Sequence, residues 1–161
     1  MAIVSWLFFV TLTMGLLKPF IDKLLKASNN LESVAIQAVR QNEGFILDLL
    51  KDKQLGEGED SFGKIVGTYK ESTINTWVPK DPPRTRKSIG QPYNFDWHGT
   101  FKDTMRVVAN DDGYTIESAT KRALEAIYNT KLTKLTKEHS DIIDKKIIIP
   151  ALYEHIFSVG V

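Results

Sequence analysis

Cysteine is absent from this chain of 161 residues. The absence excludes a disulfide-stapled scaffold, a zinc site built on thiolates and a catalytic cysteine, and it is consistent with a reducing compartment. The chain also lacks an excess of one charge, because 21 Lys and Arg residues stand against 20 Asp and Glu residues. A protein that binds nucleic acid through its bulk field is markedly basic, so any such contact here must come from a local patch.

Recognisable catalytic and metal-binding motifs are lacking as well. The three histidines, His98, His139 and His155, have no ligand partners at metal-site spacing. The residues from Asn110 faintly resemble a calcium loop, but Lys121 stands at the twelfth position, where a bidentate glutamate is required. Neither a phosphate-binding loop nor a nucleophile elbow occurs in the sequence. We therefore predict no metal, no cofactor and no enzymatic activity.

One acidic cluster is a candidate for general acid–base chemistry. Glu57, Glu59 and Asp60 lie close together in the sequence, and glycines flank Glu57 on both sides. Glycine-rich acidic stretches are typical of exposed loops. We interpret the cluster as a solvated loop.

The first 17 residues carry no charged side chain. A signal peptide places basic residues before its apolar run, whereas Lys18, Lys23 and Lys26 follow this one. A membrane span needs about 20 apolar residues, so this run lies at the lower limit. A helix that is apolar on nearly all sides can instead be buried between subunits, and we favour that interpretation for residues 1–27. The candidate contacts between copies are Trp6, Phe8, Phe9 and Leu12.

A long helix and a long loop are predicted next. Apolar residues recur at helical spacing over residues 31–55, with a weak point where Asn42 and Gly44 interrupt the pattern. Residues 56–94 are rich in Gly and Pro, which excludes regular elements over much of this stretch. Basic and aromatic residues in and beside the loop suggest contact with DNA or a partner, although a solvated loop with aromatic anchors explains the same pattern. The candidates are Lys80, Arg84, Arg86, Lys87, Trp77 and Trp97.

A β-hairpin is predicted over residues 104–119, because two alternating stretches flank an Asp112-Gly113 turn. In that register Ala109 lies opposite Ile116. The predicted apolar face comprises Met105, Val107, Ala109 and Ile116.

The predicted fold is α+β in a single domain over residues 1–161. N-terminal helices precede a small antiparallel sheet around the hairpin. Two C-terminal helices are expected over residues 119–128 and 136–157 and should pack on the sheet. Pro150 is expected to kink or restart the second helix.

An ordered series of turn and aromatic residues runs from Gln54 to Ser118. It begins with Gln54-Leu55, Asp60, Gly63, Gly67, Tyr69 and Thr73. Residues 80–87, which we call the basic stretch, follow, and then come Phe95-Asp96-Trp97-His98-Gly99-Thr100-Phe101 and the hairpin. This series resembles small virion proteins of tailed bacteriophages from the tail-completion and virion-morphogenesis group, nearest to those of crAss-like phages of gut Bacteroidetes. His98-Gly99 stands where those proteins usually have Thr-Gly, and their Tyr-Ala…His segment after the hairpin is missing.

The resemblance implies a structural subunit of an oligomeric ring in the neck or tail of the virion, through which DNA passes. Assembly would occur in the host cytoplasm. The implied partners are further copies of the chain, other neck, tail or portal proteins and packaged DNA, without a small-molecule substrate. A ring gives every copy two heterologous contacts, which suits the apolar N-terminal helix. The alternative is a small membrane-associated protein anchored by that helix, with the basic residues that follow it on the cytoplasmic side.

Overall fold

The computed structural model describes residues 18–110 and 113–158. A helix over residues 18–28 and a turn at residues 29–30 lead into α2 (Leu31–Gln41), α3 (Glu43–Asp48) and the π-helix η1 (Leu49–Gln54). The π-helix η2 (Thr73–Trp77) and α4 (Thr100–Asp103) precede the strands β1 (Arg106–Asn110) and β2 (Gly113–Glu117). The remaining elements are α5 (Lys121–Tyr128), α6 (Lys137–Ile143), the π-helix η3 (Asp144–Ile148) and α7 (Ile149–Ser158). The fold is therefore α+β, as predicted.

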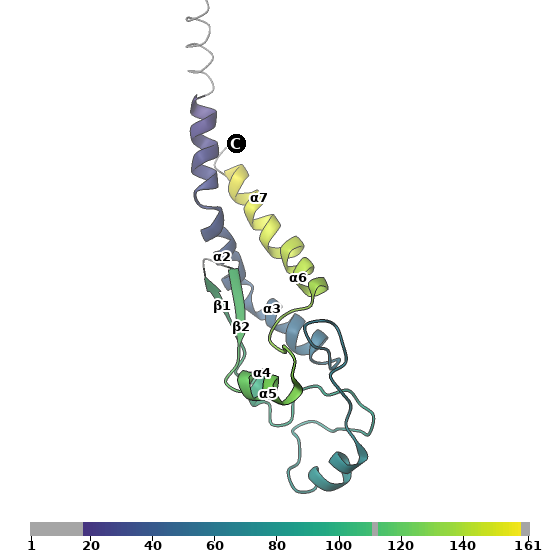
Figure 1. Ribbon diagram of the computed structural model, residues 1–161. Coiled ribbons are helices and arrows are strands. Elements are labelled where there is room, and N and C mark those ends of the chain that lie inside the picture. The colour runs from purple at the N-terminus through teal and green to yellow at the C-terminus, as the bar shows by residue number, and fades with distance from the viewer. Residues whose placement is uncertain (1–17, 111–112, 159–161) are drawn as a thin grey trace, which may run out of the picture.

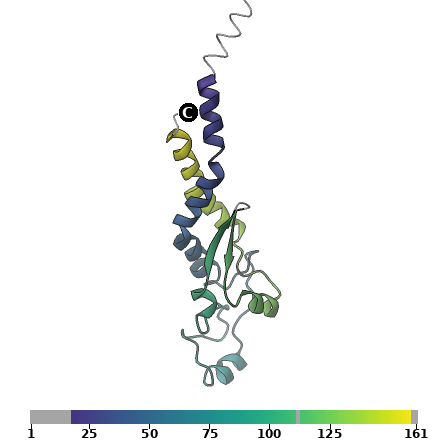
Figure 2. The same ribbon diagram turned by 90° about the vertical axis from the view of Figure 1, so that its left-hand side faces the viewer.

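The molecule is elongated, with two unlike ends (Figure 1). At one end α2 and α7 run antiparallel and side by side, and the helix over residues 18–28 extends beyond the end of α7 (Figures 1 and 2). We call residues 18–41 together with α7 the arm. The hairpin lies against α2 and α3. Residues 56–99, which we call the loop end, include the opposite extremity of the molecule.

The predicted weak point in the first long helix is confirmed. Asn42 separates α2 from α3 and leaves the helical conformation, with φ −112° and ψ 22°. Its side-chain amide donates a hydrogen bond to the carbonyl oxygen of Ala38 (2.9 Å), which is one turn earlier. Asparagine competes with the helix for backbone partners in this way, so the break arises where the sequence places it.

The hairpin is confirmed, but the predicted register is wrong. The strands pair Val107 with Ile116 and Asn110 with Gly113, so Gly113 is the first residue of β2 and not part of the turn. Because side chains alternate along a strand, a slip of two residues leaves each side chain on the same face. Met105 and Ile116 are accordingly buried, and Val107 packs against the same core.

The last long helix begins at a side-chain cap and changes its winding before Pro150. The Thr136 hydroxyl accepts a hydrogen bond from the backbone N–H of His139 (3.3 Å), which caps α6. The π-helix η3 then precedes α7, in which Pro150 is the second residue. Proline lacks an N–H and its ring displaces the preceding turn, which agrees with the predicted kink or restart.

Most of the predicted loop over residues 56–94 is irregular. Its regular features are the helical segment over residues 71–77, which contains η2, and two isolated bridges, Glu59 with Ile65 and Thr68 with Pro92. The bridges divide the loop end into smaller closed turns. Their pairing shows that this long segment is held together by contacts of its own.

The side chain of Gln54 joins two distant parts of the chain within the core. It is completely buried; its amide nitrogen donates to the carbonyl oxygen of Lys134 (2.9 Å), and its amide oxygen accepts from the N–H of Thr136 (2.9 Å). The Nδ1 atom of His139 lies 3.4 Å from the same oxygen. Both backbone groups lie beside the start of α6. Gln54 therefore sets where the C-terminal helix begins relative to η1.

We expect Gln54→Ala to lower the free energy of unfolding by about 2–4 kcal/mol, because two backbone groups lose their buried partner. Urea denaturation followed by circular dichroism measures the change. Gln37→Ala, at an exposed position of α2, is the matched control. Equal stability of the two variants would contradict the role assigned to Gln54.

Candidate functional site

Asp60 organises the first turn of the loop end. Its Oδ1 accepts hydrogen bonds from the backbone N–H groups of Phe62 (2.8 Å) and Lys64 (3.1 Å), and its Oδ2 accepts one from the Thr130 hydroxyl (2.8 Å). Burial raises the pKa of Asp60, but the hydrogen bonds outweigh burial and hold this pKa below its ordinary value. The carboxylate therefore ties the loop end to the segment that contains Thr130.

Aromatic rings form the centre of the loop end. A Cβ atom on Gly67 would lie 2.6 Å from the ring of Tyr93, so only glycine fits there without displacing that ring. The rings of Tyr93 and Tyr69 meet edge to face, with centroids 5.0 Å apart. The Tyr69 hydroxyl donates to Oδ1 of Asn94 (3.2 Å), and burial raises the pKa of Tyr69 to about 12.

Lys87 is the buried hub of the basic stretch. Its side chain is only 6% exposed. Its Nζ donates to Oγ1 of Thr85, to Oδ1 of Asn94 (2.9 Å) and to the carbonyl oxygen of Asp96 (3.1 Å), and it lies 5.9 Å from the centroid of the Tyr69 ring. Burial lowers the pKa of Lys87. An ammonium group has three N–H donors, and here all three are used within the chain.

Arg84 bridges two acidic side chains. Its Nε lies 2.8 Å from Oδ1 of Asp96, and its Nη1 donates to Oδ2 of Asp103 (2.7 Å). These two carboxylates, Asp103 first, raise the pKa of the guanidinium. A Cβ atom on Gly99 would lie 2.3 Å from Nη1, so the glycine admits the guanidinium. Arg84 thus connects the loop end to α4.

Trp97 is an anchor for the same loop. Its indole N–H donates to both the backbone oxygen (3.0 Å) and Oδ2 (3.1 Å) of Asp81. The Nε2 atom of His98 lies 3.1 Å from the same Oδ2. These contacts hold the N-terminal part of the basic stretch against the residues that follow it.

The structure therefore separates the predicted contact residues into internal anchors and exposed cations. Arg84, Lys87 and Trp97 make the internal contacts described above, and they correspond to the alternative of a loop with internal anchors. Lys80 and Arg86 are exposed, and within the described part of the chain neither has an ion-pair partner. The side chain of Trp77 lies outside the described part. The basic surface that can meet a partner is thus centred on Lys80 and Arg86.

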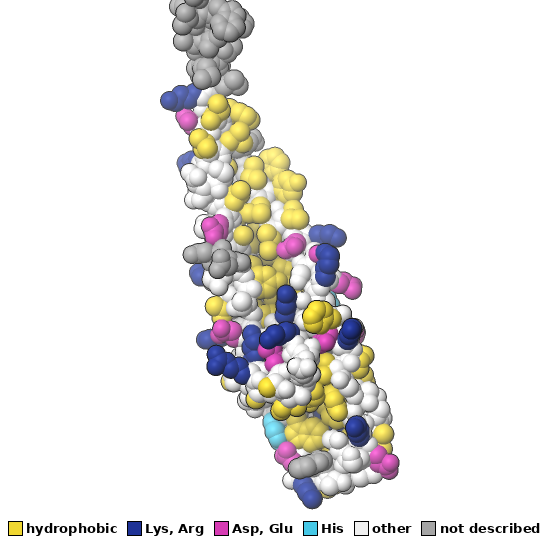
Figure 3. Space-filling view, viewed as in Figure 1, with side chains coloured by type: hydrophobic (Ala, Val, Ile, Leu, Met, Phe, Trp, Pro, Cys, Tyr) yellow, Lys and Arg dark blue, Asp and Glu magenta, His cyan; other side chains and the backbone are white. Residues whose placement is uncertain are grey.

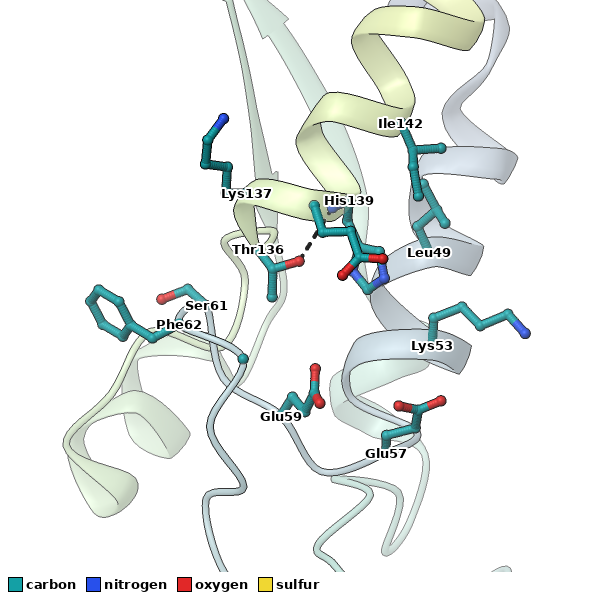
Figure 4. A pocket seen from close by; sticks show the side chains of 12 residues that line it. Leu49, Lys53, Glu57, Glu59, Ser61, Phe62, Thr136, Lys137, His139 and Ile142 are labelled. Atoms are coloured by element: carbon teal, nitrogen blue, oxygen red, sulfur yellow. Dashed lines mark hydrogen bonds between the residues drawn. The ribbon is translucent and has the colours of Figure 1, made fainter.

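A cleft of about 760 Å³ lies between the start of the loop end and α6 (Figure 4). Its walls include Leu49, Lys53, Glu57, Glu59, His139 and Ile142. Among the described residues, no hydrogen bond joins the carboxylates of Glu57 and Glu59 to each other or to a neighbouring side chain. The exposed Glu57 agrees with the interpretation of a solvated acidic loop. The interpretation is wrong for Asp60, which is buried because its carboxylate accepts hydrogen bonds from Phe62, Lys64 and Thr130.

Metal-binding residues are not gathered anywhere in residues 18–110 and 113–158: no group of three or more suitable side chains occurs there. His98 contacts Asp81, and His139 contacts Gln54 at another place in the fold. His155 lies in α7. The three histidines therefore lie at separate places in the fold and do not share one site.

The arm carries an exposed apolar face. Four of its side chains lie on the helix over residues 18–28 and three lie on α7, and each is between 41% and 69% exposed. The face comprises Phe20, Ile21, Leu24, Leu25, Ile149, Tyr153 and Phe157. Figure 3 shows hydrophobic side chains in a band over both helices on one side of the molecule.

Sequence reasoning located only part of the candidate surface. The predicted contacts Trp6, Phe8, Phe9 and Leu12 lie outside the described residues. The contribution of α7 was missed, although its signal is present as a spacing of four between its exposed apolar residues. The buried Lys102, which donates to the backbone oxygen of Lys51, has no signal in the sequence pattern.

Comparison of the chain with known protein families, with curated proteins and with solved structures finds no match. Within the described residues, none of the helices combines the length and the hydrophobicity required to cross a bilayer. The functional argument therefore starts from the surfaces of the molecule.

We expect Lys87→Met to lower the free energy of unfolding by about 2–4 kcal/mol, because largely buried acceptors lose their donor. Lys80→Met is the matched control at an exposed position, where the change should stay within about 0.5 kcal/mol. Urea denaturation monitored by tryptophan fluorescence gives both values. If both variants are equally stable, Lys87 is not the hub of the loop end.

The stability of the chain should fall as the pH rises from 10 toward 12. The unfolded chain loses the Tyr69 proton near the ordinary value of 10.0, whereas the folded chain keeps it up to about pH 12, so raising the pH favours unfolding. Tyr69→Phe should lose about 1–2 kcal/mol less over this interval. Urea denaturation at several pH values, with Tyr153→Phe as the control, measures the difference. A pH dependence shared by wild type and Tyr69→Phe would contradict this assignment.

Proposed function

We propose that this chain is a structural protein of a phage virion that assembles into an oligomeric ring of the neck or tail, through which DNA passes. It has no catalytic role in this proposal. Its partners are other copies of itself and adjacent neck, tail or portal proteins. The resemblance of residues 54–118 to tail-completion and virion-morphogenesis proteins suggests the proposal, and the shape of the protomer supports it.

The observation that carries the proposal is the elongated protomer with two unlike ends. A subunit of a closed ring contacts its two neighbours through different surfaces. The chain offers an apolar face on the arm and an internally braced loop end that exposes the cations Lys80 and Arg86 beside scattered apolar residues (Figures 1 and 3). Surfaces of such different chemistry suit heterologous contacts and stacking on a second ring.

The residues of the phage-like series act as a scaffold. Gln54, Asp60, Gly67 and Tyr69 each bind or accommodate another part of the chain, as described above. The series thus specifies a fold and leaves the surface free to vary. Ring subunits that share one fold but contact different neighbours need separate residues for folding and for binding.

Lys80 and Arg86 are the residues through which the loop end would meet DNA or an acidic partner. Both are exposed on a segment held in place by Arg84, Lys87 and Trp97. Electrostatic attraction to phosphate depends on such solvent-facing cations. In a ring, every copy presents the same pair, so a small local charge is multiplied around the channel.

We expect the double variant Lys80→Glu/Arg86→Glu to fold normally but to yield few infectious particles when it replaces the wild-type chain in the phage. Reversal of the charge should repel DNA or an acidic neighbour while the scaffold stays intact. Circular dichroism checks folding, and plaque titre with electron microscopy of the particles gives the result.

The double variant Arg122→Glu/Lys134→Glu makes the same change of charge at exposed positions outside the arm and the loop end, and it should assemble normally. Normal titres from both double variants would remove the loop end from the proposal. Failure to detect the wild-type chain in purified particles by mass spectrometry would refute the proposed function itself.

A further inference from the structure

We infer that the apolar face of the arm is covered by the arm of a second copy of this chain. The two arms would pack through the same residues and form a bundle of helices. Such an isologous contact joins copies of two stacked rings and is separate from the heterologous contacts within one ring. The inference deepens the proposed function and rests on it in one respect, namely that copies of the chain assemble with one another.

The chain does not cover this face within its described residues. The helix over residues 18–28 extends past the end of α7 (Figures 1 and 2). Four apolar residues of this helix, Phe20, Ile21, Leu24 and Leu25, are between 41% and 56% exposed. On α7, the rings of Tyr153 and Phe157 stack on each other at 6.3 Å and remain mostly exposed. Monomeric proteins rarely leave a continuous apolar surface of this kind in water.

The spacing of apolar residues favours helices that pack along one another. Alternating steps of three and four connect the apolar residues Phe20, Leu24, Ala27, Leu31 and Val34. The turn at residues 29–30 interrupts the helix within this repeat, and Ala27 is already buried within the protomer, so the part open to a second copy is centred on Phe20 and Leu24. The same steps continue toward the N-terminus through Leu17, Val10, Trp6 and Ile3, with Thr13 at the remaining position. A repeat of this kind is typical of coiled coils and bundles.

Further apolar residues broaden the seam. Ile21 and Leu25 flank the repeat on the helix over residues 18–28 and are exposed. A stripe wider than the two seam positions suits contact with more than one neighbouring helix. The arm of a second copy supplies two helices at once, so that four helices would meet in a bundle.

The exposed area of the face supplies a large part of one side of a specific interface. Aromatic side chains have about 150–250 Å² each, and three of the seven residues are aromatic. With the exposed fractions of the whole face, the available surface is several hundred square ångströms per copy. Each partner in an interface of standard size contributes roughly 800 Å², which the residues around the face can complete.

The charges of α7 favour protein over lipid as the occupant of its part of the face. Helices that lie on a membrane surface carry Lys and Arg on their polar face. The ten residues of α7 include Glu154 but no Lys or Arg, whereas the helix over residues 18–28 carries Lys18, Lys23 and Lys26. The arm of another copy presents the same side chains to this surface and requires no added charge.

The test compares the wild-type chain with Phe20→Ser/Leu24→Ser/Tyr153→Ser by sedimentation over a range of concentrations. We expect the wild type to self-associate and the triple variant to associate at least about a hundredfold more weakly, because substitutions at the centre of an interface have large effects. Phe62→Ser/Ile127→Ser, at exposed apolar positions outside the arm, is the control and should associate like the wild type. Circular dichroism establishes that all variants are folded.

The absence of cysteine provides a second measurement. In the single variants Ile21→Cys and Tyr153→Cys, a disulfide can only join two copies, so mild oxidation should give covalent dimers on a non-reducing gel. Ile127→Cys should remain monomeric. If the arm variants do not cross-link while the wild type is monomeric at every concentration, the arm does not pair with a second copy.

Two other outcomes also overturn the inference. Association of the triple variant with wild-type strength would place self-assembly elsewhere on the chain, and the proposed ring would then stand without the arm contact. Flotation of the wild type, but not of the triple variant, with phosphatidylglycerol–phosphatidylcholine vesicles would identify a lipid surface as the occupant. If the arms do not pair but the chain is still found in purified particles, this inference fails while the proposed function stands.

Discussion

The buried amide of Gln54 connects the two halves of the chain. It satisfies the carbonyl group of Lys134 and the N–H group of Thr136, which would otherwise be buried without partners. Because Thr136 also caps α6, the same amide sets the start of the helix that returns along α2. The antiparallel arm therefore depends on hydrogen bonds between residues 80 and 82 positions apart in sequence, outside the arm itself.

The loop end shows how charge can serve structure instead of recognition. Lys87 and Arg84 lie in the basic stretch, but their N–H groups contact oxygen atoms of Asn94, Asp96 and Asp103. Burial makes an unpaired ammonium group costly, so a lysine that enters the core must find acceptors. The result is a long segment with few regular elements that nevertheless holds its neighbours, Lys80 and Arg86, on the surface.

The two ends of the protomer differ in the chemistry that they present. The loop end is braced by internal hydrogen bonds and exposes the cations Lys80 and Arg86, whereas the arm exposes a band of apolar side chains that water does not favour. In the proposed ring, the apolar face would drive association between copies and the loop end would meet the DNA channel or the adjacent ring. Stability and assembly would then depend on different residues of the same chain.

Local patterns were sufficient to predict the long helices and the hairpin of this fold, but not the short helices η2 and α4. The break at Asn42, the hairpin and its apolar face, and the change of helix before Pro150 all follow from residues a few positions apart, because propensity and periodicity act locally. The apolar character of the N-terminal residues was equally evident. The register of the hairpin could not be predicted in this way, because turns at two adjacent positions place the same side chains on the same face.

The roles of individual polar residues depended on contacts that only folding creates. Nothing near Lys87 in the sequence distinguishes it from Lys80, and the difference arises because Asn94 and the backbone of Asp96 surround one and not the other. The pairing of α7 with the helices before it likewise joins residues more than 100 positions apart. Hydrogen bonding and burial are decided by neighbours in space, whereas the sequence pattern records neighbours along the chain.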